Sequence, residues 1–197
     1  SAPDMETMAA EVLKRRGRID ILVAAAGILR GETGKPQMLH ETAAAAFDRV
    51  IDINLTGTYL ANRAVLGAML KAKSGNIVNV SSTSGKKGLA YDAAYCASKF
   101  GVIGLTESLA EEVRPQGVRV QVVLPEVVDT PMLEQNGPLF RPKEMLPAER
   151  VAQFIAHLVT LPAGMVLVNP VLGVFRAGRG ARGAGGAPTG SGTRAGA

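Results

Sequence analysis

Residues 76–82 read NIVNVSS, a short β-branched run that ends in two serines. Two runs of the same kind occur before and after it, IDILVAAAG at 19–27 and VRVQVVLPE at 118–126, and longer stretches with helical spacing separate the three. This alternation is typical of parallel strands joined by crossover helices. The almost continuous apolar character of such runs is expected when both faces of a sheet are buried. The sequence therefore predicts an α/β fold with a doubly wound parallel sheet.

The same patterns predict the individual elements. Strands are expected near residues 19–24, 76–81, 118–124 and 165–171. Helices are expected over Met5–Arg16, Glu41–Lys71 with a bend near Asn54, Ala93–Arg114 and Ala148–Thr160. After Pro125 the chain contains Pro and Gly but little periodicity, which predicts a long loop with room for one short helix. In a compact α/β domain, a loop of this length is usually functional.

The 197 residues are expected to form one folded domain over 1–175 and a disordered tail over 176–197. The tail is almost entirely Gly, Ala, Arg, Ser, Thr and Pro, so it cannot bury enough surface to fold. It also holds four arginines and no acidic residue, which account for most of the net charge of +5. The folded part is nearly balanced in charge, so no nucleic-acid partner is expected.

Composition also predicts where the protein is located and whether it binds a metal ion. No apolar run reaches the length of a membrane span and no leader pattern opens the chain, so no membrane partner is expected. The single cysteine, Cys96, cannot form an internal disulfide, which is typical of a reducing compartment and predicts a cytoplasmic location. Two isolated histidines and one cysteine cannot build a usual zinc site, so no metal is expected.

The stretch YCASK at 95–99 sets Tyr95 and Lys99 four positions apart, where both side chains lie on one face of a helix. This pairing alone is a weak signal, because a surface pair beside a half-buried ring would look the same. Ser82 strengthens it, since this serine follows a strand at its carboxyl end, where open α/β sheets bind ligands. The hydroxyl of Ser82 and the phenol of Tyr95 are therefore expected to converge.

Such a group of side chains suits the interconversion of a ketone and an alcohol. The unperturbed pKa of a phenol is about 10, and a nearby ammonium group such as that of Lys99 is expected to lower it. Tyr95 could then exchange a proton with a substrate oxygen, while Ser82 hydrogen-bonds the same oxygen. The chemistry also requires a hydride carrier, and a nicotinamide cofactor at the carboxyl edge of the sheet would fit.

Five stretches of the sequence together resemble the motifs of one protein family. They read RIDILVAAAG, DINLTGTY, NIVNVSSTSG, YCASK and LPEVVDTPM. In this order and at these spacings the chain resembles the short-chain dehydrogenase/reductase (SDR) family, of single-domain Rossmann type, from Ser1 to about Leu172. The resemblance implies an NAD(P)-dependent oxidoreductase that interconverts a secondary alcohol and a ketone by hydride transfer. Its cofactor would be NAD or NADP, and its substrate a small carbonyl or alcohol compound.

The resemblance also implies roles for individual residues. Ser82 is similar to the catalytic serine of the family, Tyr95 to its general acid/base, and Lys99 to the partner that also binds the nicotinamide ribose. Asn54 resembles the asparagine that bends its helix and holds a water linked to the lysine. The remaining cofactor contacts fall on Ala24, Ala25, Gly27, Pro125, Val128 and Thr130.

Two departures from the family are visible. The Gly-rich turn TGxxxGxG is absent, and the chain begins only 19 residues before Asp20, so a truncated domain of about four strands is expected, with the strand at 19–24 as an open edge. In addition, Ala24 and Ala25 stand where the family often has asparagines, and Glu126 replaces the usual glycine after Pro125, which would put a carboxylate near the nicotinamide.

Two alternative functions and one kind of partner are also consistent with the sequence. The chain could be a catalytically inactive SDR-like fragment, acting as a binding or assembly module that lacks the cofactor phosphate loop. It could also be an epimerase or dehydratase of the extended branch, although such chains carry a larger C-terminal domain. A stripe of small residues on the helix from Ala93, together with the resemblance, predicts a homodimer or homotetramer.

Overall fold

The central sheet is parallel, as the sequence predicts. The structure is a computed structural model, and it describes residues 1–31, 35–136 and 142–175. Within these residues four strands pair in the order β1-β2-β3-β6. They span Ile21–Ala24 (β1), Gly75–Val80 (β2), Val118–Pro125 (β3) and Val171–Leu172 (β6). The register places Ala24 beside Asn79 and Val80 beside Val123, so the carboxyl ends of β1, β2 and β3 meet at one edge.

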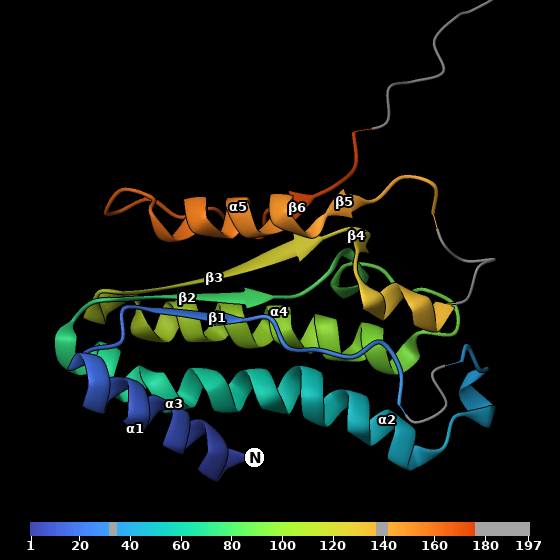
Figure 1. Ribbon diagram of the computed structural model, residues 1–197, viewed down its shortest axis with the longest axis horizontal. Helices are drawn as coiled ribbons and strands as arrows, with labels where there is room; N and C mark the ends of the chain where they lie inside the picture. The colour runs from blue at the N-terminus through green and yellow to red at the C-terminus, as the bar shows by residue number, and fades with distance from the viewer. Residues whose placement is uncertain (32–34, 137–141, 176–197) are drawn as a thin grey trace, which may run out of the picture.

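Helices lie on both sides of this sheet (Figure 1). The described α-helices span Ala2–Arg16 (α1), Ala44–Ile51 (α2), Gly57–Ala72 (α3), Ala93–Val113 (α4) and Ala148–Val159 (α5). α5 lies on one side, whereas α1, α3 and α4 lie on the other. This three-layer arrangement confirms the predicted α/β class.

Each face of β2 packs into its own hydrophobic cluster. On one face, Ile77 packs with Val65 and Met69 of α3. On the other face, Val78 packs with Leu158 of α5. All five side chains are at most 2% exposed. Because successive strand residues point to opposite faces, burial on both sides removes the apolar–polar alternation that a half-exposed strand would show.

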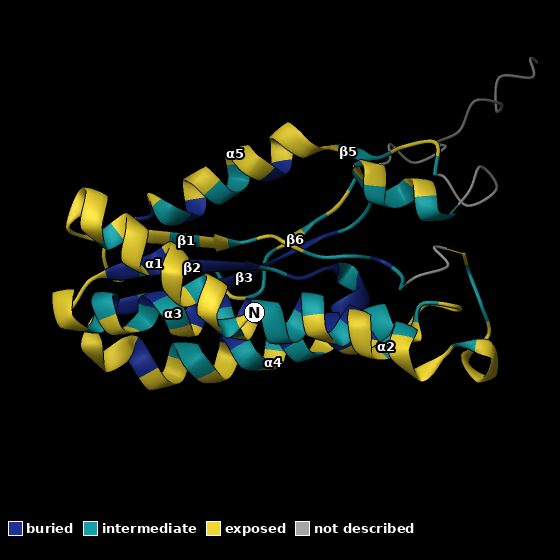
Figure 2. Ribbon diagram, turned by 60° about the horizontal axis from the view of Figure 1, so that its bottom comes forward, coloured by how far each residue is buried: buried dark blue, intermediate teal, exposed yellow. Residues whose placement is uncertain are grey.

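β1 is an edge strand of the described sheet, because within the described residues it pairs with β2 on one side and with no strand on the other. Leu22 faces the helices and packs against the core cluster. Ile21 and Val23 are 48% and 42% exposed, and the exposed segments of β1 are visible in Figure 2. The predicted open edge is thus confirmed in the described part of the chain, and an apolar edge of this kind is a site for strand pairing.

The long helix predicted over 41–71 is divided near Asn54, as expected. α2 ends at Ile51, a π-helical turn spans Asp52–Thr56, and α3 begins at Gly57. A π-helical turn widens the helix locally and is frequent at functional sites. Here it directs the side chain of Asn54 into the interior, where it is fully buried.

The C-terminal strand is shorter than predicted. Of the range 165–171 only Val171 is in a strand, and with Leu172 it forms the two-residue β6. Asn169 has a φ of 47°, a left-handed conformation that interrupts extended structure. Pro170 lacks an N–H group, so it cannot donate to a neighbouring strand. These two residues explain why pairing begins late.

The predicted loop after Pro125 contains two small elements. Val128–Asp129 (β4) pairs with Leu146–Pro147 (β5), and a 3₁₀ turn spans Pro131–Asn136. The predicted short helix is therefore of the 3₁₀ kind. The predicted tail over 176–197 lies outside the described residues.

The turn that follows β2 packs closely against α4. Ser81 Oγ donates to the carbonyl oxygen of Lys99 at 2.8 Å, and the 3₁₀ turn Thr83–Gly85 follows. A β-carbon on Gly85 would lie 2.7 Å from the Lys99 carbonyl oxygen and 2.9 Å from Ser81 Oγ. Both distances are shorter than van der Waals contact, so the absence of a side chain at Gly85 permits this approach.

We expect Gly85→Ala to lower the free energy of unfolding by about 1–3 kcal/mol, because the added methyl group must displace backbone atoms. Gly88→Ala is a matched control in the same loop, since nothing lies within 4 Å of a β-carbon there. Its free energy of unfolding should change by less than about 0.5 kcal/mol. Chemical denaturation of the two variants measures the difference, and equal stabilities would contradict the close packing of this turn.

Candidate active site

Ser82 and Tyr95 meet at the carboxyl end of β2. Ser82 precedes the 3₁₀ turn Thr83–Gly85, and its hydroxyl oxygen accepts a hydrogen bond from Ser84 N at 3.1 Å. Tyr95 lies in the first turn of α4, and its phenol is hydrogen-bonded to the Ser82 side chain. The fold thus brings together two of the residues to which the sequence assigns chemistry.

Lys99 lies one turn after Tyr95 on α4. Its Nζ is 5.6 Å from the centroid of the Tyr95 ring and donates a hydrogen bond to the carbonyl oxygen of Val80 at 2.9 Å. The residue is only 4% exposed. The carbonyl group of Val80, the last residue of β2, therefore holds the buried ammonium group of Lys99 beside the phenol of Tyr95.

The electrostatics of this pair differ from the sequence-based prediction. We predict from the sequence that Lys99 lowers the pKa of Tyr95, and the structure shows that this is wrong. Burial raises the pKa of the Tyr95 phenol, the hydrogen bond to Ser82 lowers it in part, and charges on Asp92 and Cys96 raise it further. Burial also lowers the pKa of Lys99 from 10.5 to about 8. Loss of water disfavours the charged form of each group, so Tyr95 carries its proton at neutral pH.

Asn54 ties the segment after β1 to α4. Its Oδ1 accepts a hydrogen bond from Ile28 N at 2.8 Å, and its Nδ2 donates to Ile28 O at 2.9 Å and to Ser98 Oγ at 3.0 Å. Ser98 in turn donates to the carbonyl oxygen of Tyr95 at 2.7 Å. Ser98 therefore links Asn54 to the backbone of Tyr95, and it directly precedes Lys99 in the chain. Its role in holding a water stays a prediction.

The residues after β1 approach the same place. Ala24 ends the strand, and Ala25 follows as an exposed residue. A β-carbon on Gly27 would lie 3.3 Å from Asn54 Oδ1 and 3.6 Å from Lys99 Nζ. The backbone at Gly27 thus runs directly beside the buried amide and the ammonium group.

The second predicted cofactor segment follows β3. Pro125 ends β3, Val128 lies in β4, and Thr130 Oγ1 donates to the carbonyl oxygen of Val128 at 3.4 Å. Pro125 is thus the last residue of its strand, whereas Val128 and Thr130 lie beyond the carboxyl end of the sheet, where Figure 1 shows β4 and β5. Their contact with a nicotinamide carboxamide stays a prediction.

Glu126 has a structural role that the sequence does not indicate. Its backbone N donates to Leu172 O at 2.7 Å, and its Oε2 accepts a hydrogen bond from Val174 N at 3.1 Å. The carboxylate is thus engaged with the chain just after β6. A glycine at this position could not make the second bond.

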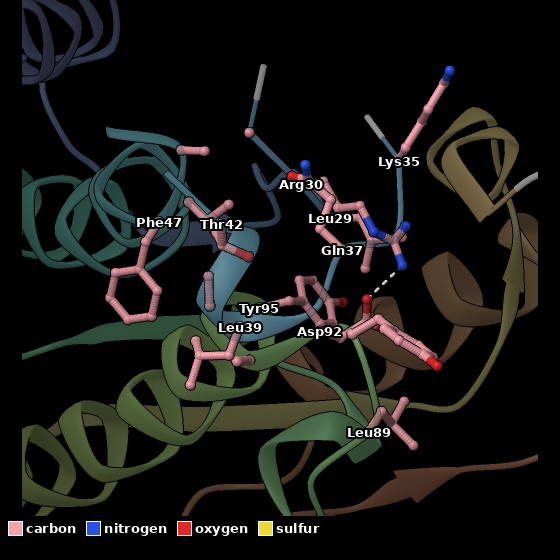
Figure 3. A pocket seen from close by; sticks show the side chains of 16 residues that line it. Leu29, Arg30, Lys35, Gln37, Leu39, Thr42, Phe47, Leu89, Asp92 and Tyr95 are labelled. Carbon is pink, nitrogen blue, oxygen red and sulfur yellow. Dashed lines mark hydrogen bonds and ion pairs between the residues drawn. The ribbon is translucent and has the colours of Figure 1, made fainter. Parts of the chain in front are cut away.

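Tyr95 also lines a pocket at this edge of the sheet (Figure 3). The apolar part of the lining includes Leu29, Leu39, Phe47 and Leu89. Arg30 and Asp92 form an ion pair beside Tyr95. Sequence analysis missed this pair: Asp92 directly precedes α4, a place typical of a helix cap, but its partner is 62 residues away and no local pattern connects them.

Among the described residues, no group of three or more His, Cys, Asp or Glu side chains could hold a metal ion. None of the described helices has the length and apolar character needed to cross a membrane.

The fold and the site together define a parallel α/β domain with serine, tyrosine and lysine at the carboxyl edge of its sheet. A family model described as short chain dehydrogenase matches residues 1–138. Because this match covers well over half of the sequence, the chain belongs to the short-chain dehydrogenase family. The resemblance inferred from the sequence motifs is thereby confirmed.

The chain is similar to several characterised proteins of this kind. It is 38% identical over 182 residues to a 3-oxoacyl-[acyl-carrier-protein] reductase of Synechocystis sp., covering 88% of this chain and 70% of the relative. It is 43% identical over 119 residues to 2-dehydro-3-deoxy-L-rhamnonate dehydrogenase (NAD(+)) of Sphingomonas sp., covering 60% of this chain and 46% of the relative. The solved structure of ElxO with NADP bound matches with a TM-score of 0.75 at 27% identity, over 88% of this chain and 72% of that one. The chain spans about half the length of several of its curated relatives.

The lowered pKa of Lys99 predicts a pH-dependent stability. Between about pH 8 and 10.5 the unfolded chain binds more protons at this group than the folded protein does. The contribution of Lys99 to the free energy of unfolding therefore rises with pH between about pH 8 and 10.5. Below about pH 8, Lys99 is charged in both states, so the folded protein carries the full cost of burying that charge. Lys99→Met should gain stability relative to the wild type as pH falls from 10 to 7, by an amount on the order of 3 kcal/mol.

Denaturation of wild type and variant at the two pH values measures this change. Lys71→Met is the control, because Lys71 is an exposed lysine on α3 and should show no comparable pH-dependent gain. A stability difference between Lys99→Met and wild type that is the same at both pH values would contradict the burial penalty.

Proposed function

We propose that this chain is the catalytic part of an NAD(P)-dependent oxidoreductase that interconverts a secondary alcohol and a ketone. The observation that carries the proposal is the meeting of Ser82, Tyr95 and Lys99 at the carboxyl edge of a parallel sheet, where Tyr95 lines a pocket. Open α/β sheets bind their ligands at this edge. Membership of the short-chain dehydrogenase family supports the same reaction class.

Each side chain has a distinct task in this proposal. Tyr95 donates its proton to the substrate oxygen during reduction, and the phenol is protonated at neutral pH because burial raises its pKa above the ordinary value. Ser82 hydrogen-bonds the same oxygen and stabilises the charge that develops on it. Lys99 supplies positive charge close to the phenol. The apolar lining of the pocket suits a substrate whose carbonyl group is attached to an apolar body.

The site also fits the nicotinamide end of a dinucleotide. An ammonium group has three N–H donors, and the bond from Lys99 to Val80 O uses one of them, so donors remain for ribose hydroxyls. Gly27 leaves room for close approach beside Lys99. NAD or NADP would supply the hydride acceptor or donor. The residues proposed to hold it are Ala24, Ala25, Gly27, Tyr95, Lys99, Pro125, Val128 and Thr130.

The proposal predicts that Tyr95→Phe removes catalysis but leaves cofactor binding. With the purified chain and a panel of ketones, kcat for ketone reduction should fall by about 10²–10⁴-fold, because the proton donor is lost. Titration of NADH and NADPH fluorescence should give a dissociation constant for the variant close to that of the wild type. Ser82→Ala should likewise lower kcat more than it changes cofactor affinity.

Thr7→Val is a suitable control, because Thr7 is exposed on α1 and its hydroxyl bonds only within that helix. A wild-type chain that is folded yet binds neither cofactor nor ketone would overturn the proposal. That outcome would favour the alternative of a catalytically inactive binding or assembly module.

We further propose that the chain forms a homodimer or homotetramer through α3 and α4. A groove between these helices has an apolar part that is lined by Tyr59, Leu66, Leu105 and Leu109. Along α4 the small residues Ala97, Gly104 and Ser108 are exposed, so a helix from a second copy could approach closely. The family resemblance implies pairing of these same two helices across a two-fold axis.

Sedimentation equilibrium tests this self-association. The wild type should behave as a dimer or tetramer, and Ser108→Arg should shift it to monomer, because a large cation cannot be accommodated at a close helix contact. Ala152→Arg places the same side chain at an exposed position of α5, in the opposite layer, and should leave the mass unchanged. A monomeric wild type would refute the proposed interface.

We also propose a cytoplasmic location. Cys96 is a free and buried thiol. A chain with a single cysteine gains nothing from an oxidising compartment, because it cannot form an internal disulfide.

A further inference from the structure

The ion pair between Arg30 and Asp92 is buried. The side chain of Arg30 is 8% exposed and that of Asp92 is 12% exposed. The other ion pairs found in the described residues join side chains that are all about half exposed or more. Surface pairs contribute little, whereas a buried charge must be matched closely by its partners. This pair is therefore a specific structural feature of the pocket.

The guanidinium group of Arg30 joins three separate segments. Its Nη2 pairs with Asp92 Oδ1 at 2.5 Å, at the start of α4. Its Nη1 donates to Asn136 Oδ1 at 2.8 Å and to Gln135 O at 3.4 Å, in the 3₁₀ turn Pro131–Asn136. The backbone N of Arg30 adds a bond to Gln135 Oε1 at 3.2 Å. One residue thus fastens the segment after β1, the start of α4 and this 3₁₀ turn together.

The contact between Arg30 and Asp92 lies in the same helical turn as Tyr95. Asp92 does not cap α4 with its side chain. Its backbone carbonyl oxygen accepts a hydrogen bond from Cys96 N at 2.8 Å, whereas its carboxylate binds Arg30. Tyr95 lies between Asp92 and Cys96 in this first helical turn. Figure 3 shows the dashed line from Arg30 to Asp92 close to Tyr95. The orientation of this turn therefore depends on where Arg30 holds Asp92.

Arg30 is poorly suited to bind a substrate anion itself. Its charge is already matched by Asp92, and both of its terminal nitrogens are occupied. Its Nε is buried without a partner in the described residues, so it is closed to solvent as well. Among the cations lining the pocket, this leaves Lys35 as the one better placed to meet an acidic group.

We propose that Arg30 is a positioning residue, which holds the 3₁₀ turn Pro131–Asn136 and the first turn of α4 in a fixed relation around the pocket and so orients the Tyr95 phenol. The catalytic part of this inference rests on the function proposed above. The geometric part does not, because it concerns contacts within the chain.

Hydrogen–deuterium exchange of the full chain tests the geometric part. Arg30→Lys keeps the charge for Asp92 but cannot reach both segments with one ammonium group. Exchange in peptides covering 131–136 should accelerate by roughly tenfold, as expected on loss of hydrogen bonds to a charged group, while residues 89–96 stay protected. The double variant Arg30→Met with Asp92→Asn removes both charges, so it avoids an unpaired buried carboxylate, and exchange should accelerate in both segments.

Arg119→Met is the matched control. Arg119 also uses its guanidinium group to bind backbone carbonyls, those of Leu161 and Pro162, but it lies away from the pocket lining. Exchange in 89–96 and 131–136 should be unchanged in this variant. Unchanged exchange in both segments of the double variant would overturn the proposal, whether or not the wild type reduces ketones.

Steady-state kinetics test the catalytic part in a wild type that is active. The double variant Arg30→Met with Asp92→Asn should lower kcat by about 10- to 100-fold through misplacement of the phenol. The loss should be equal for a neutral ketone and for a ketone carrying a carboxylate, with KM little changed. A rise in KM confined to the anionic ketone would overturn the positioning role and make Arg30 a substrate ligand.

Discussion

The buried side-chain amide of Asn54 is the interaction on which the arrangement of the site depends. It binds both backbone groups of Ile28 and the hydroxyl of Ser98, so it connects the segment after β1 with the helix that carries Tyr95 and Lys99. Asn54 and Ser98 are fully buried, and each of the bonded groups would lose its partner if the amide were displaced. The π-helical turn is what places Asn54 there, because a regular helix would present this position at a different angle.

Burial then determines the charges of the two residues beside this amide. Loss of water raises the pKa of Tyr95 and lowers that of Lys99, so each group is moved toward its neutral form. The hydroxyl of Ser82 partly opposes this for Tyr95, whereas the carbonyl of Val80 holds Lys99 in place. Groups whose pKa values are shifted by their surroundings are typical of acid–base sites.

Several polar and charged contacts lie together at the carboxyl edge of the sheet. The amino-terminal part of the sheet packs against apolar side chains, whereas the carboxyl edge holds the serine turn, the Arg30–Asp92 pair and the Glu126 carboxylate. Parallel strands direct all their carboxyl ends to one edge, so the loops that follow them are neighbours in space. This neighbourhood lets single side chains such as Arg30 and Glu126 fasten segments that are far apart in sequence.

Local patterns in the sequence determined much of this protein. The strands around 19–24, 76–81 and 118–124, the division of the long helix at Asn54, and the shared face of Tyr95 and Lys99 all follow from apolar runs and helical spacing. These are properties of neighbouring residues, so the chain itself carries them. Tertiary structure alone decided the pKa shifts, the Arg30–Asp92 pair, the engagement of Glu126 after β6 and the late start of that strand. Each of these depends on burial or on a partner from a distant segment, which no local pattern specifies.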